Sequence, residues 1–271
     1  MRLAMGRIIC IANQKGGVGK TTTSVNLSAC LADLGKKVLL VDMDPQANAT
    51  SGLAAVIDEE QGEADIYSSL MGDSDIREAV VRATPEGLSL IPSSPDLAGA
   101  EIELLDMERR EYRLKAAIDS VAEEYDYTII DCPPALSILT LNALVAARRV
   151  MIPLQCEYFA LEGLGRLLKT LGLVRERLNP DLKMDGILLT MYDARNNLSR
   201  QVQEEVGRHF GDRLYRTVIP RNVRLGEAPS YGLPVISYDM HCAGAQAYIA
   251  FADEVLAKDG LVAGAGAKNA S

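Results

Sequence analysis

Short apolar runs alternate along the chain with longer segments in which apolar residues recur at helical spacing. The runs predict strands at residues 8–12, 38–41, 88–92, 125–131, 150–154, 184–191 and 215–220. Helical spacing predicts helices at residues 25–34, at 96–122 as two helices, from Ser137 onward, and at 161–178, 196–210 and 243–256. Uninterrupted apolar strands fit a parallel sheet that is covered on both faces. The alternation therefore predicts a single-domain α/β fold with a mostly parallel central sheet and helices on both faces.

The remaining stretches lack these patterns. Residues 50–75 are polar, acidic and punctuated by glycine, so we expect surface loops and short helices there. Residues 221–234 contain Gly226, Pro229 and Gly232 and are predicted to form a loop. We expect residues 1–6 to be a flexible N-terminus and residues 258–271, rich in alanine and glycine, to be a disordered tail. The predicted domain thus covers residues 7–257.

Composition narrows the class of protein. The 271 residues include no Trp and no run of 18 or more apolar residues, which predicts an aliphatic core and no transmembrane helix. The first residues lack the apolar segment of a signal peptide. Five scattered cysteines without a paired spacing indicate reduced thiols in a cytosolic protein. The formal net charge of −9 by itself argues against nucleic acid as a partner.

Residues 13–22 read Asn-Gln-Lys-Gly-Gly-Val-Gly-Lys-Thr-Thr and lie between a predicted strand and a predicted helix. Glycines let backbone N–H groups turn toward a phosphate, and the following helix adds the positive end of its dipole. In such a loop Lys20 supplies charge for the β- and γ-phosphates, and Thr21 supplies a hydroxyl for Mg²⁺. Gln14 stands where the ordinary phosphate-binding loop has its first glycine, and Lys15 follows it, so this loop is a variant. The fixed order of lysines, glycines and threonines makes an incidental glycine-rich turn a poor explanation.

Three aspartates stand at predicted strand ends. The run 38–41 leads into Asp42 and Asp44, and a later strand ends at Asp131 before two prolines. Ligands of open α/β sheets bind at the carboxyl edge of the strands. A lone strand-end aspartate often caps a helix, but together with the loop at 13–22 Asp131 is predicted to hold Mg²⁺ directly or through water. Cys132, which follows it, is interpreted as a small buried neighbour.

Basic residues concentrate between Arg195 and Arg224. Seven arginines, no lysine and three acidic residues lie in this stretch, which gives a local charge of +4 in an acidic chain. One interpretation is a solvated helix face followed by a loop. The other is a surface that contacts the phosphate backbone of a nucleic acid.

Four motifs resemble those of the ParA/Soj chromosome-partitioning ATPases, which carry the deviant Walker A form of the phosphate loop. They are Lys15-Gly-Gly-Val-Gly-Lys-Thr-Thr22, Val41-Asp-Met-Asp-Pro-Gln46, Ile130-Asp-Cys-Pro-Pro134 and Arg221-Asn-Val-Arg-Leu-Gly-Glu-Ala-Pro-Ser230. The segment Tyr192-Asp-Ala-Arg-Asn-Asn197 adds to the last of them, and the resemblance spans residues 7 to about 256. It implies a P-loop NTPase-like fold and an ATPase with slow intrinsic turnover that uses ATP and Mg²⁺.

The resemblance assigns roles to the loop residues. Nucleotide contacts are implied for Lys15, Gly16, Gly17, Val18, Gly19, Lys20, Thr21 and Thr22. Lys20 would bind the β- and γ-phosphates in its own subunit, and Thr22 the α-phosphate. Lys15 would reach across a dimer interface to the partner's nucleotide and neutralise charge on the transferred phosphoryl group, as an arginine finger does. Gly16 would let the two subunits approach closely.

Other residues receive roles in the same way. Thr21 would ligate Mg²⁺, with Asp42 and Asp131 supporting the metal site. Asp44 would position or deprotonate the attacking water. Adenine would lie near Met191 and Pro220.

The resemblance also implies partners. ATP would drive a sandwich dimer that binds double-stranded DNA without sequence preference. Arg195 and Arg224 resemble the DNA-contacting arginines of the family, with Arg221 as a helper. A ParB-type centromere-binding protein would stimulate hydrolysis, and the protein would be cytoplasmic and associated with the nucleoid.

Alternatives remain open. A MinD-like membrane switch shares the ATPase core but needs a basic amphipathic helix at the C-terminus, which residues 258–271 do not offer. An electron carrier like the nitrogenase iron protein needs cysteines that share a cluster across a dimer, and Cys132 has no second cysteine in a matching loop. A scaffold that coats DNA and uses ATP only to assemble is also possible, although Lys15 and Asp44 favour hydrolysis. Chromosome, plasmid or other cargo is left undecided.

Overall fold

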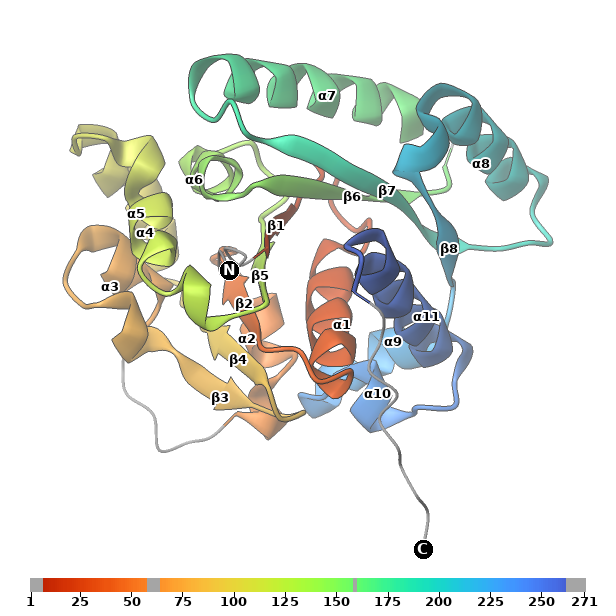
Figure 1. The fold of residues 1–271 in the computed structure, drawn as a ribbon, viewed down its shortest axis with the longest axis horizontal. Coiled ribbons are helices and arrows are strands. Elements are labelled where there is room, and N and C mark those ends of the chain that lie inside the picture. Colours follow the sequence, from red (N-terminus) through yellow and green to blue (C-terminus); the bar gives the residue numbers. More distant parts are fainter. Residues whose placement is uncertain (1–6, 58–63, 158–159, 262–271) are drawn as a thin grey trace, which may run out of the picture.

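The structure, a computed structural model, describes residues 7–57, 64–157 and 160–261. In these residues eight strands form one sheet in the order β3-β4-β2-β5-β1-β6-β7-β8 (Figure 1). The strands are β1 Arg7–Ile11, β2 Val38–Asp42, β3 Val81–Ala83, β4 Leu88–Ile91, β5 Tyr127–Asp131, β6 Arg149–Gln155, β7 Lys183–Tyr192 and β8 Leu214–Pro220. All neighbours pair in parallel except β3 and β4. The predicted α/β fold with a mostly parallel sheet is confirmed.

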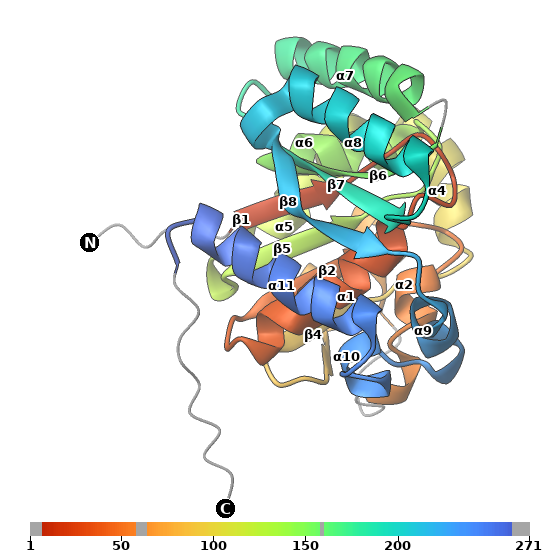
Figure 2. The ribbon, with the colours of Figure 1, turned by 90° about the vertical axis from the view of Figure 1, so that its right-hand side faces the viewer.

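Helices cover both faces of the sheet. One face packs against α3 Ile66–Met71, α4 Leu97–Glu103, α5 Arg113–Asp119, α6 Ile138–Ala146, α7 Ala160–Arg177 and α8 Asn197–Phe210. The other packs against α1 Lys20–Asp33, α2 Asn48–Ser51, α10 Val235–Tyr238 and α11 Ala243–Lys258, with α9 Val223–Glu227 beside them. Figure 2 shows α11 lying along α1. Each face has its own aliphatic core, which is why the strand runs are apolar without alternation.

The register of the sheet gathers the predicted site at one edge. Asp42 at the end of β2 pairs with Asp131 at the end of β5, and Asp131 pairs with Ile11 at the end of β1. The loop 13–22 leaves β1 at this edge, so residues far apart in sequence meet beside it. This is the carboxyl edge of the parallel strands, where open α/β sheets bind ligands.

Three predictions about elements are wrong. Strand β3 is missed, because it is three residues long and pairs antiparallel with β4. The segment predicted as a loop at 221–234 holds α9 and a 3₁₀ helix at Ala228–Tyr231. Its helices form because the Asn222 side chain caps α9 and Pro229 falls in the first turn of the 3₁₀ helix, where proline costs no hydrogen bond.

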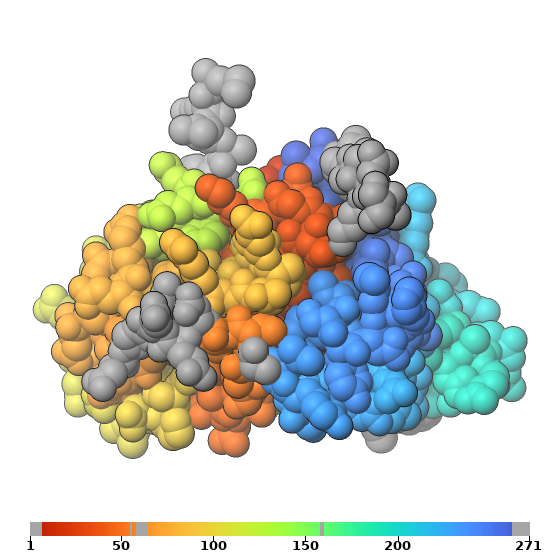
Figure 3. Space-filling model, turned by 90° about the horizontal axis from the view of Figure 1, so that it is seen from below, coloured from red at the N-terminus to blue at the C-terminus, as the bar shows by residue number. Residues whose placement is uncertain are grey.

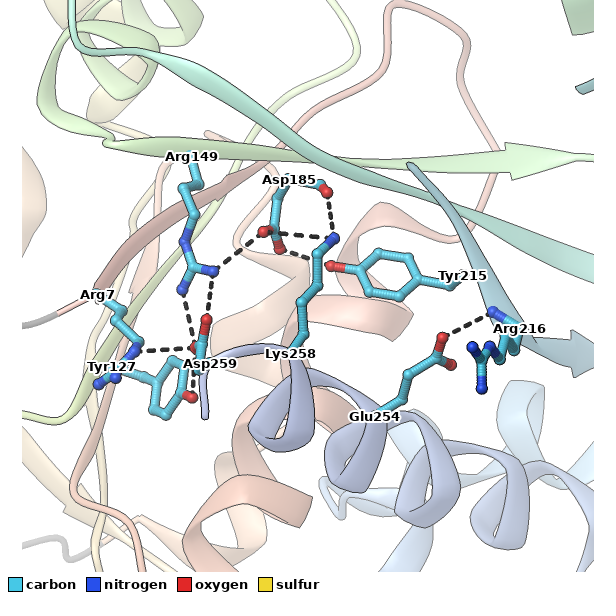
Figure 4. A network of polar contacts seen from close by, with 9 residues as sticks. All are labelled: Arg7, Tyr127, Arg149, Asp185, Tyr215, Arg216, Glu254, Lys258 and Asp259. Carbon is cyan, nitrogen blue, oxygen red and sulfur yellow. Dashed lines mark hydrogen bonds and ion pairs between the residues drawn. The ribbon is translucent and has the colours of Figure 1, made fainter. Parts of the chain in front are cut away.

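The third error is the start of the tail. Lys258 belongs to α11, and the residue after it, Asp259, is buried in a polar network (Figure 4), so the predicted boundary at residue 257 falls inside α11. The predicted flexible N-terminus at residues 1–6, the tail beyond residue 261 and part of the 50–75 stretch lie outside the described residues.

That network closes the sheet edge opposite the predicted site. The Arg149 guanidinium donates to Asp259 at 2.7 and 3.0 Å and to Asp185 at 3.1 Å (Figure 4). The hydroxyl of Tyr127 donates to Asp259 at 2.7 Å, and Tyr215 to Asp185 at 2.6 Å. Strands β5, β6, β7 and β8 are thereby tied to the C-terminal end of α11. The opposite end of α11 lies near α9, since a Cβ at Gly244 would meet the Leu225 side chain at 2.7 Å.

Candidate nucleotide site and arginine surface

The glycine loop is held in place by buried polar side chains on both sides. Asn13 donates to the Pro153 carbonyl at 2.8 Å and accepts from the Lys15 N–H at 3.0 Å. Thr190, on β7, donates to the Val18 carbonyl at 2.8 Å. Because these bonds are made within the chain, they hold the loop in one shape, and such preorganisation lowers the cost of binding a ligand.

Backbone conformation explains the glycines of the loop. Gly17 and Gly19 have φ of +74° and +86°, in the left-handed region that side chains disfavour. Gly19 is the N-cap of α1, so the helix begins at Lys20, earlier than the apolar pattern alone indicated. No acidic side chain stands in the first turn of α1. The positive end of the helix dipole therefore points at the loop, as a phosphate-binding site requires.

Lys20 and Thr21 lie inside this site. Lys20 is 7% exposed, and its Nζ lies 3.4 Å from the Lys15 carbonyl. Burial lowers the pKa of Lys20, while the nearby charges of Asp131 and Asp44 act in the opposite direction. The Thr21 side chain is close enough to Asp131 to act on its carboxyl group, where it tends to lower the pKa. Ammonium, hydroxyl and carboxylate thus meet at the N-terminus of α1.

Asp131 offers a carboxylate oxygen, which is the kind of ligand that Mg²⁺ prefers. It is fully buried, and Ser24 donates to its Oδ1 at 2.8 Å, but Oδ2 is buried without a hydrogen-bond partner. Burial raises the pKa of Asp131, and the neighbouring Asp42 raises it further. A buried carboxylate oxygen left over beside a threonine hydroxyl fits a hydrated Mg²⁺, which takes oxygen ligands and keeps several waters.

Asp42 and Asp44 occupy different environments. The Asp42 carboxylate is buried and accepts from the Thr50 N–H, the Thr50 hydroxyl and the Asp44 N–H at 2.9, 2.8 and 3.1 Å. Burial raises the pKa of Asp42, and these hydrogen bonds oppose the rise. The Asp44 side chain lines the cavity and accepts from the Gln46 N–H at 2.9 Å. Asp42 therefore holds the strand-to-helix turn, and Asp44 faces the ligand space.

Two cavities adjoin the loop. The larger, of about 690 Å³, is lined by Lys20, Thr21 and Asp44, and across from them by the 3₁₀ helix at Ala228–Tyr231. The smaller, of about 210 Å³, is lined by Thr22, Met191, Pro220 and the α9 residues Leu225 and Gly226. Met191 and Pro220, predicted near adenine, thus do lie beside the loop. Figure 3 shows the surface of the α9–α10 region next to that of the segment near residue 50.

Lys15 does not point into its own site. Its ammonium forms an ion pair with Glu157, which follows β6, and both side chains are about two-fifths exposed. The lysine is thus held at the surface, where a second subunit could be reached. Gly16 is beside it, and a Cβ there would meet no atom within 4 Å in this chain.

The three predicted DNA-binding arginines lie together at one end of the sheet, but two are paired with carboxylates. Arg195 follows β7 and forms a bidentate pair with Asp193, at 3.0 Å for each bond. Arg224, in α9, donates to Glu227 at 2.7 Å and lies 3.4 Å from Asp239. Arg221 follows β8, and its backbone N–H donates to the Tyr192 carbonyl at 3.2 Å.

Several positioning residues were missed by the sequence analysis. Ser24 holds Asp131, Asn13 and Thr190 hold the loop, and the Asn26 side chain accepts from the Val235 N–H at 2.7 Å. The motif could have pointed to Asn13, which precedes the glycines. The partners of Asn26 are 209 residues apart, so only the fold brings them together.

Cys132 is fully buried, and its Sγ lies 3.2 Å from that of Cys10. Both sulfur atoms belong to the core, as the interpretation of Cys132 as a small buried neighbour predicted, and they do not face a surface where a cluster could be shared. All five cysteines are free thiols. In the part of the chain that the structure describes, no helix has the length and apolar character needed to cross a membrane.

Comparison with known proteins extends this picture. A family described as an AAA domain matches residues 6–184. The Bacillus subtilis sporulation initiation inhibitor protein Soj is 58% identical over 93% of this chain and 99% of its own. The Myxococcus xanthus chromosome partitioning protein ParA is 53% identical over 94% of this chain and 89% of its own.

A solved structure also matches. It is of a Mycobacterium smegmatis protein named cobyrinic acid a,c-diamide synthase, with bound ADP and magnesium. The two chains are 41% identical, with a TM-score of 0.79, and the match covers 94% of this chain and 97% of the other. The fold, the loop geometry and these likenesses agree: the chain is an ATPase that belongs to the ParA/Soj family of chromosome-partitioning ATPases.

Proposed function

We propose that the protein binds Mg-ATP, dimerises on it and then binds double-stranded DNA without sequence preference, to partition a chromosome or plasmid. A ParB-type centromere-binding protein stimulates its slow hydrolysis, and it works in the cytoplasm on the nucleoid. One observation carries the proposal. Helix α9, which bears Arg224, walls the smaller cavity beside the phosphate loop together with Arg221, and the 3₁₀ helix that follows α9 walls the larger one.

At the phosphates, each residue has a distinct task. The loop N–H groups and Lys20 bind the β- and γ-phosphates, and Thr22, which lines both cavities, binds the α-phosphate. Thr21 and Asp131 hold Mg²⁺, which neutralises charge on the phosphates when bound. Asp42 fixes the turn that carries Asp44. Asp44 faces the ligand space and positions the attacking water or takes its proton.

Lys15 completes the site of the partner subunit. Its ion pair with Glu157 keeps the ammonium outside its own cavity and partly exposed. In the dimer the ammonium leaves Glu157 and neutralises charge on the partner's transferred phosphoryl group, as an arginine finger does. Gly16, with open space where a Cβ would stand, lets the second backbone come close.

Dimerisation couples ATP to DNA. Two subunits join two arginine surfaces, and two linked sets of phosphate contacts raise affinity far more than either set alone. Hydrolysis removes the γ-phosphate contacts that order the dimer and so releases DNA. Met191 and Pro220 place adenine in the smaller cavity against α9.

The test is binding to a random-sequence duplex with ATP, ADP or no nucleotide, for wild type and Arg224→Ala. Wild type should bind only with ATP, and Arg224→Ala should bind about tenfold more weakly with a shallower salt dependence. Arg166→Ala, on the exposed face of α7, is the matched control and should bind as wild type does. Absence of DNA binding in every nucleotide state would contradict the proposal and favour another cargo, as in a MinD-like role. Binding without any phosphate release would favour a scaffold.

A further inference from the structure

Carboxylates lie beside the three arginines that were predicted to bind DNA. Arg195, Arg221 and Arg224 are matched by three carboxylates close to them, from Asp193, Glu227 and Asp239. All three acids lie outside the stretch 195–224, Asp239 by 15 residues, so the local count of +4 did not include them. A surface whose formal charges cancel attracts DNA far less than its arginines alone would.

The carboxylates take the positions on the guanidinium groups that phosphate oxygens would need. Asp193 accepts from both Nε and Nη2 of Arg195, the fork geometry that a phosphate also uses. Arg221 also acts on Asp193, because both arginines hold the pKa of that carboxyl below its usual range, Arg195 most strongly. At neutral pH Asp193 is therefore a charged occupant of the arginine site.

Arg224 is enclosed more completely. Its guanidinium bonds Glu227 and approaches Asp239, and it lies 5.9 Å from the centre of the Tyr238 ring. The Tyr238 hydroxyl donates to the same Glu227 oxygen at 3.3 Å. The His241 N–H donates to Asp239 at 3.2 Å, so that carboxylate is itself oriented. Phosphate must replace this set of partners before it can bind Arg224.

We propose that Asp193, Glu227 and Asp239 act as internal competitors of DNA phosphate, occupying Arg195 and Arg224 and thereby keeping the DNA affinity of the free chain low. The inference rests on the DNA binding proposed above. All three acids are about one-third exposed, so DNA can reach the pairs and displace them. Exposed ion pairs are weak enough for a polyanion in a joined dimer surface to outcompete them.

Contacts through α10 connect the larger cavity to the Asp239–Arg224 pair. Asn26 lines the larger cavity and accepts from the N–H of Val235, the first residue of α10. Asp239 directly follows α10, and Glu227 is in α9, which lines the smaller cavity's wall. A ligand that shifts α10 against α9 would therefore change the distance between Asp239 and Arg224.

The experiment measures binding of a labelled random-sequence duplex by fluorescence anisotropy, with ATP or ADP and across a salt series. The variants are Asp193→Asn, Glu227→Gln, Asp239→Asn and the triple variant, which keep side-chain shape and remove charge. Glu162→Gln is the control, because it removes one charge from an exposed ion pair with Arg166 on α7, away from the three arginines. Thermal unfolding of each variant checks that the fold is retained.

Each single variant should bind DNA about threefold more tightly than wild type with ATP, and the triple variant about tenfold or more. The triple variant should also show measurable binding with ADP. Its affinity should fall more steeply with salt, because no displaced carboxylate takes up cations while DNA releases its own.

Two results would overturn the inference while leaving the proposed function standing. One is ATP-dependent DNA binding by wild type that the variants leave unchanged; the other is an equal gain in Glu162→Gln, which would assign the effect to net charge. A wild type and triple variant that both fail to bind DNA in any nucleotide state would contradict the inference and the proposed DNA binding together.

Discussion

The phosphate loop and the arginine surface lie near each other but are built in opposite ways. Around the loop, buried side chains such as Asn13 and Thr190 hold the backbone, and Lys20 is almost fully buried. On the arginine surface, Arg195 and Arg224 are exposed and paired with exposed acids. Buried, fully bonded groups fix one geometry, whereas exposed pairs exchange partners at little cost. The loop is preorganised for its ligand, and the arginine surface has to be rearranged.

The largest expected effect is the loss of ATP hydrolysis when a buried residue of the phosphate loop is replaced. Lys20→Ala removes the buried ammonium that is proposed to bind the β- and γ-phosphates, so ATP hydrolysis should fall about a hundredfold or more. Nucleotide binding should weaken as well, because the charge acts on the bound phosphates before any reaction. Phosphate release and binding of a fluorescent ATP analogue measure the two effects. Lys37→Ala, an exposed lysine before β2, should change neither; retained turnover in Lys20→Ala would exclude Lys20 from the site.

Asp44→Ala separates binding from hydrolysis within the same region. Because Asp44 faces the ligand space and not the loop N–H groups, ATP binding should persist while phosphate release falls about a hundredfold. Because hydrolysis is proposed to release DNA, the ATP-dependent complex of the variant with DNA should persist longer than that of wild type. Asp33→Ala, at the exposed end of α1, serves as the control. Loss of ATP binding along with turnover would show that Asp44 holds the nucleotide and not the water.

Asp259→Asn tests the network that anchors α11 at the opposite sheet edge. The substitution removes the charge that strengthens the bonds to Arg149 and Tyr127, so the free energy of unfolding should be about 2 kcal/mol smaller in the variant at pH 7. Burial acts to raise the pKa of Asp259, but Arg149 and Tyr127 outweigh it and the pKa is lowered. A lowered folded-state pKa stabilises above the unfolded value, near 3.8, and that contribution is lost as pH falls through the folded-state pKa.

The variant and wild type should therefore converge in stability as pH falls below about 4. Urea unfolding at pH 7 and at pH 3 provides the comparison, with Asp119→Asn, in an exposed pair with Lys115, as the control. A deficit that is equal at both pH values would show that the carboxylate charge is not what stabilises α11.

The smallest effect is expected on the exposed side. Arg195→Ala removes one guanidinium that is 91% exposed and already neutralised by Asp193, so DNA affinity should fall only about threefold. Arg224→Ala, in the more enclosed position, should cost more. Anisotropy titrations of both variants at one salt concentration rank them. An Arg195→Ala loss larger than that of Arg224→Ala would reverse the assignment of the main contact.

Sequence alone predicted the preorganised side well, because its signals are local. The loop, Asp42 and Asp131 follow apolar runs, and strand ends of a parallel sheet meet at one edge. The supports of the loop were beyond reach: Thr190 and Val18 are 172 residues apart, and nothing near either residue marks the contact.

For the arginine surface, the sequence indicated the cluster of arginines but not the helices that carry them or the acids that pair with them. Gly226 and Pro229 indicated a loop, yet Gly226 lies in an exposed helix and Pro229 in a first turn, where both residues are tolerated. Asp193 and Glu227 fell just outside the stretch in which charge was counted, and only the fold brings Asp239, which follows α10, beside Arg224. Charge counted along a sequence does not report the charge of a surface.

An ATP-bound dimer as the DNA-binding species is tested most directly by sedimentation of a short labelled duplex with the protein, in ATP and in ADP. We predict that the DNA-bound complex contains two chains, forms with ATP and is absent with ADP at moderate salt. A complex of one chain on the duplex that forms equally well with ADP would contradict the coupling of nucleotide, dimer and arginine surface.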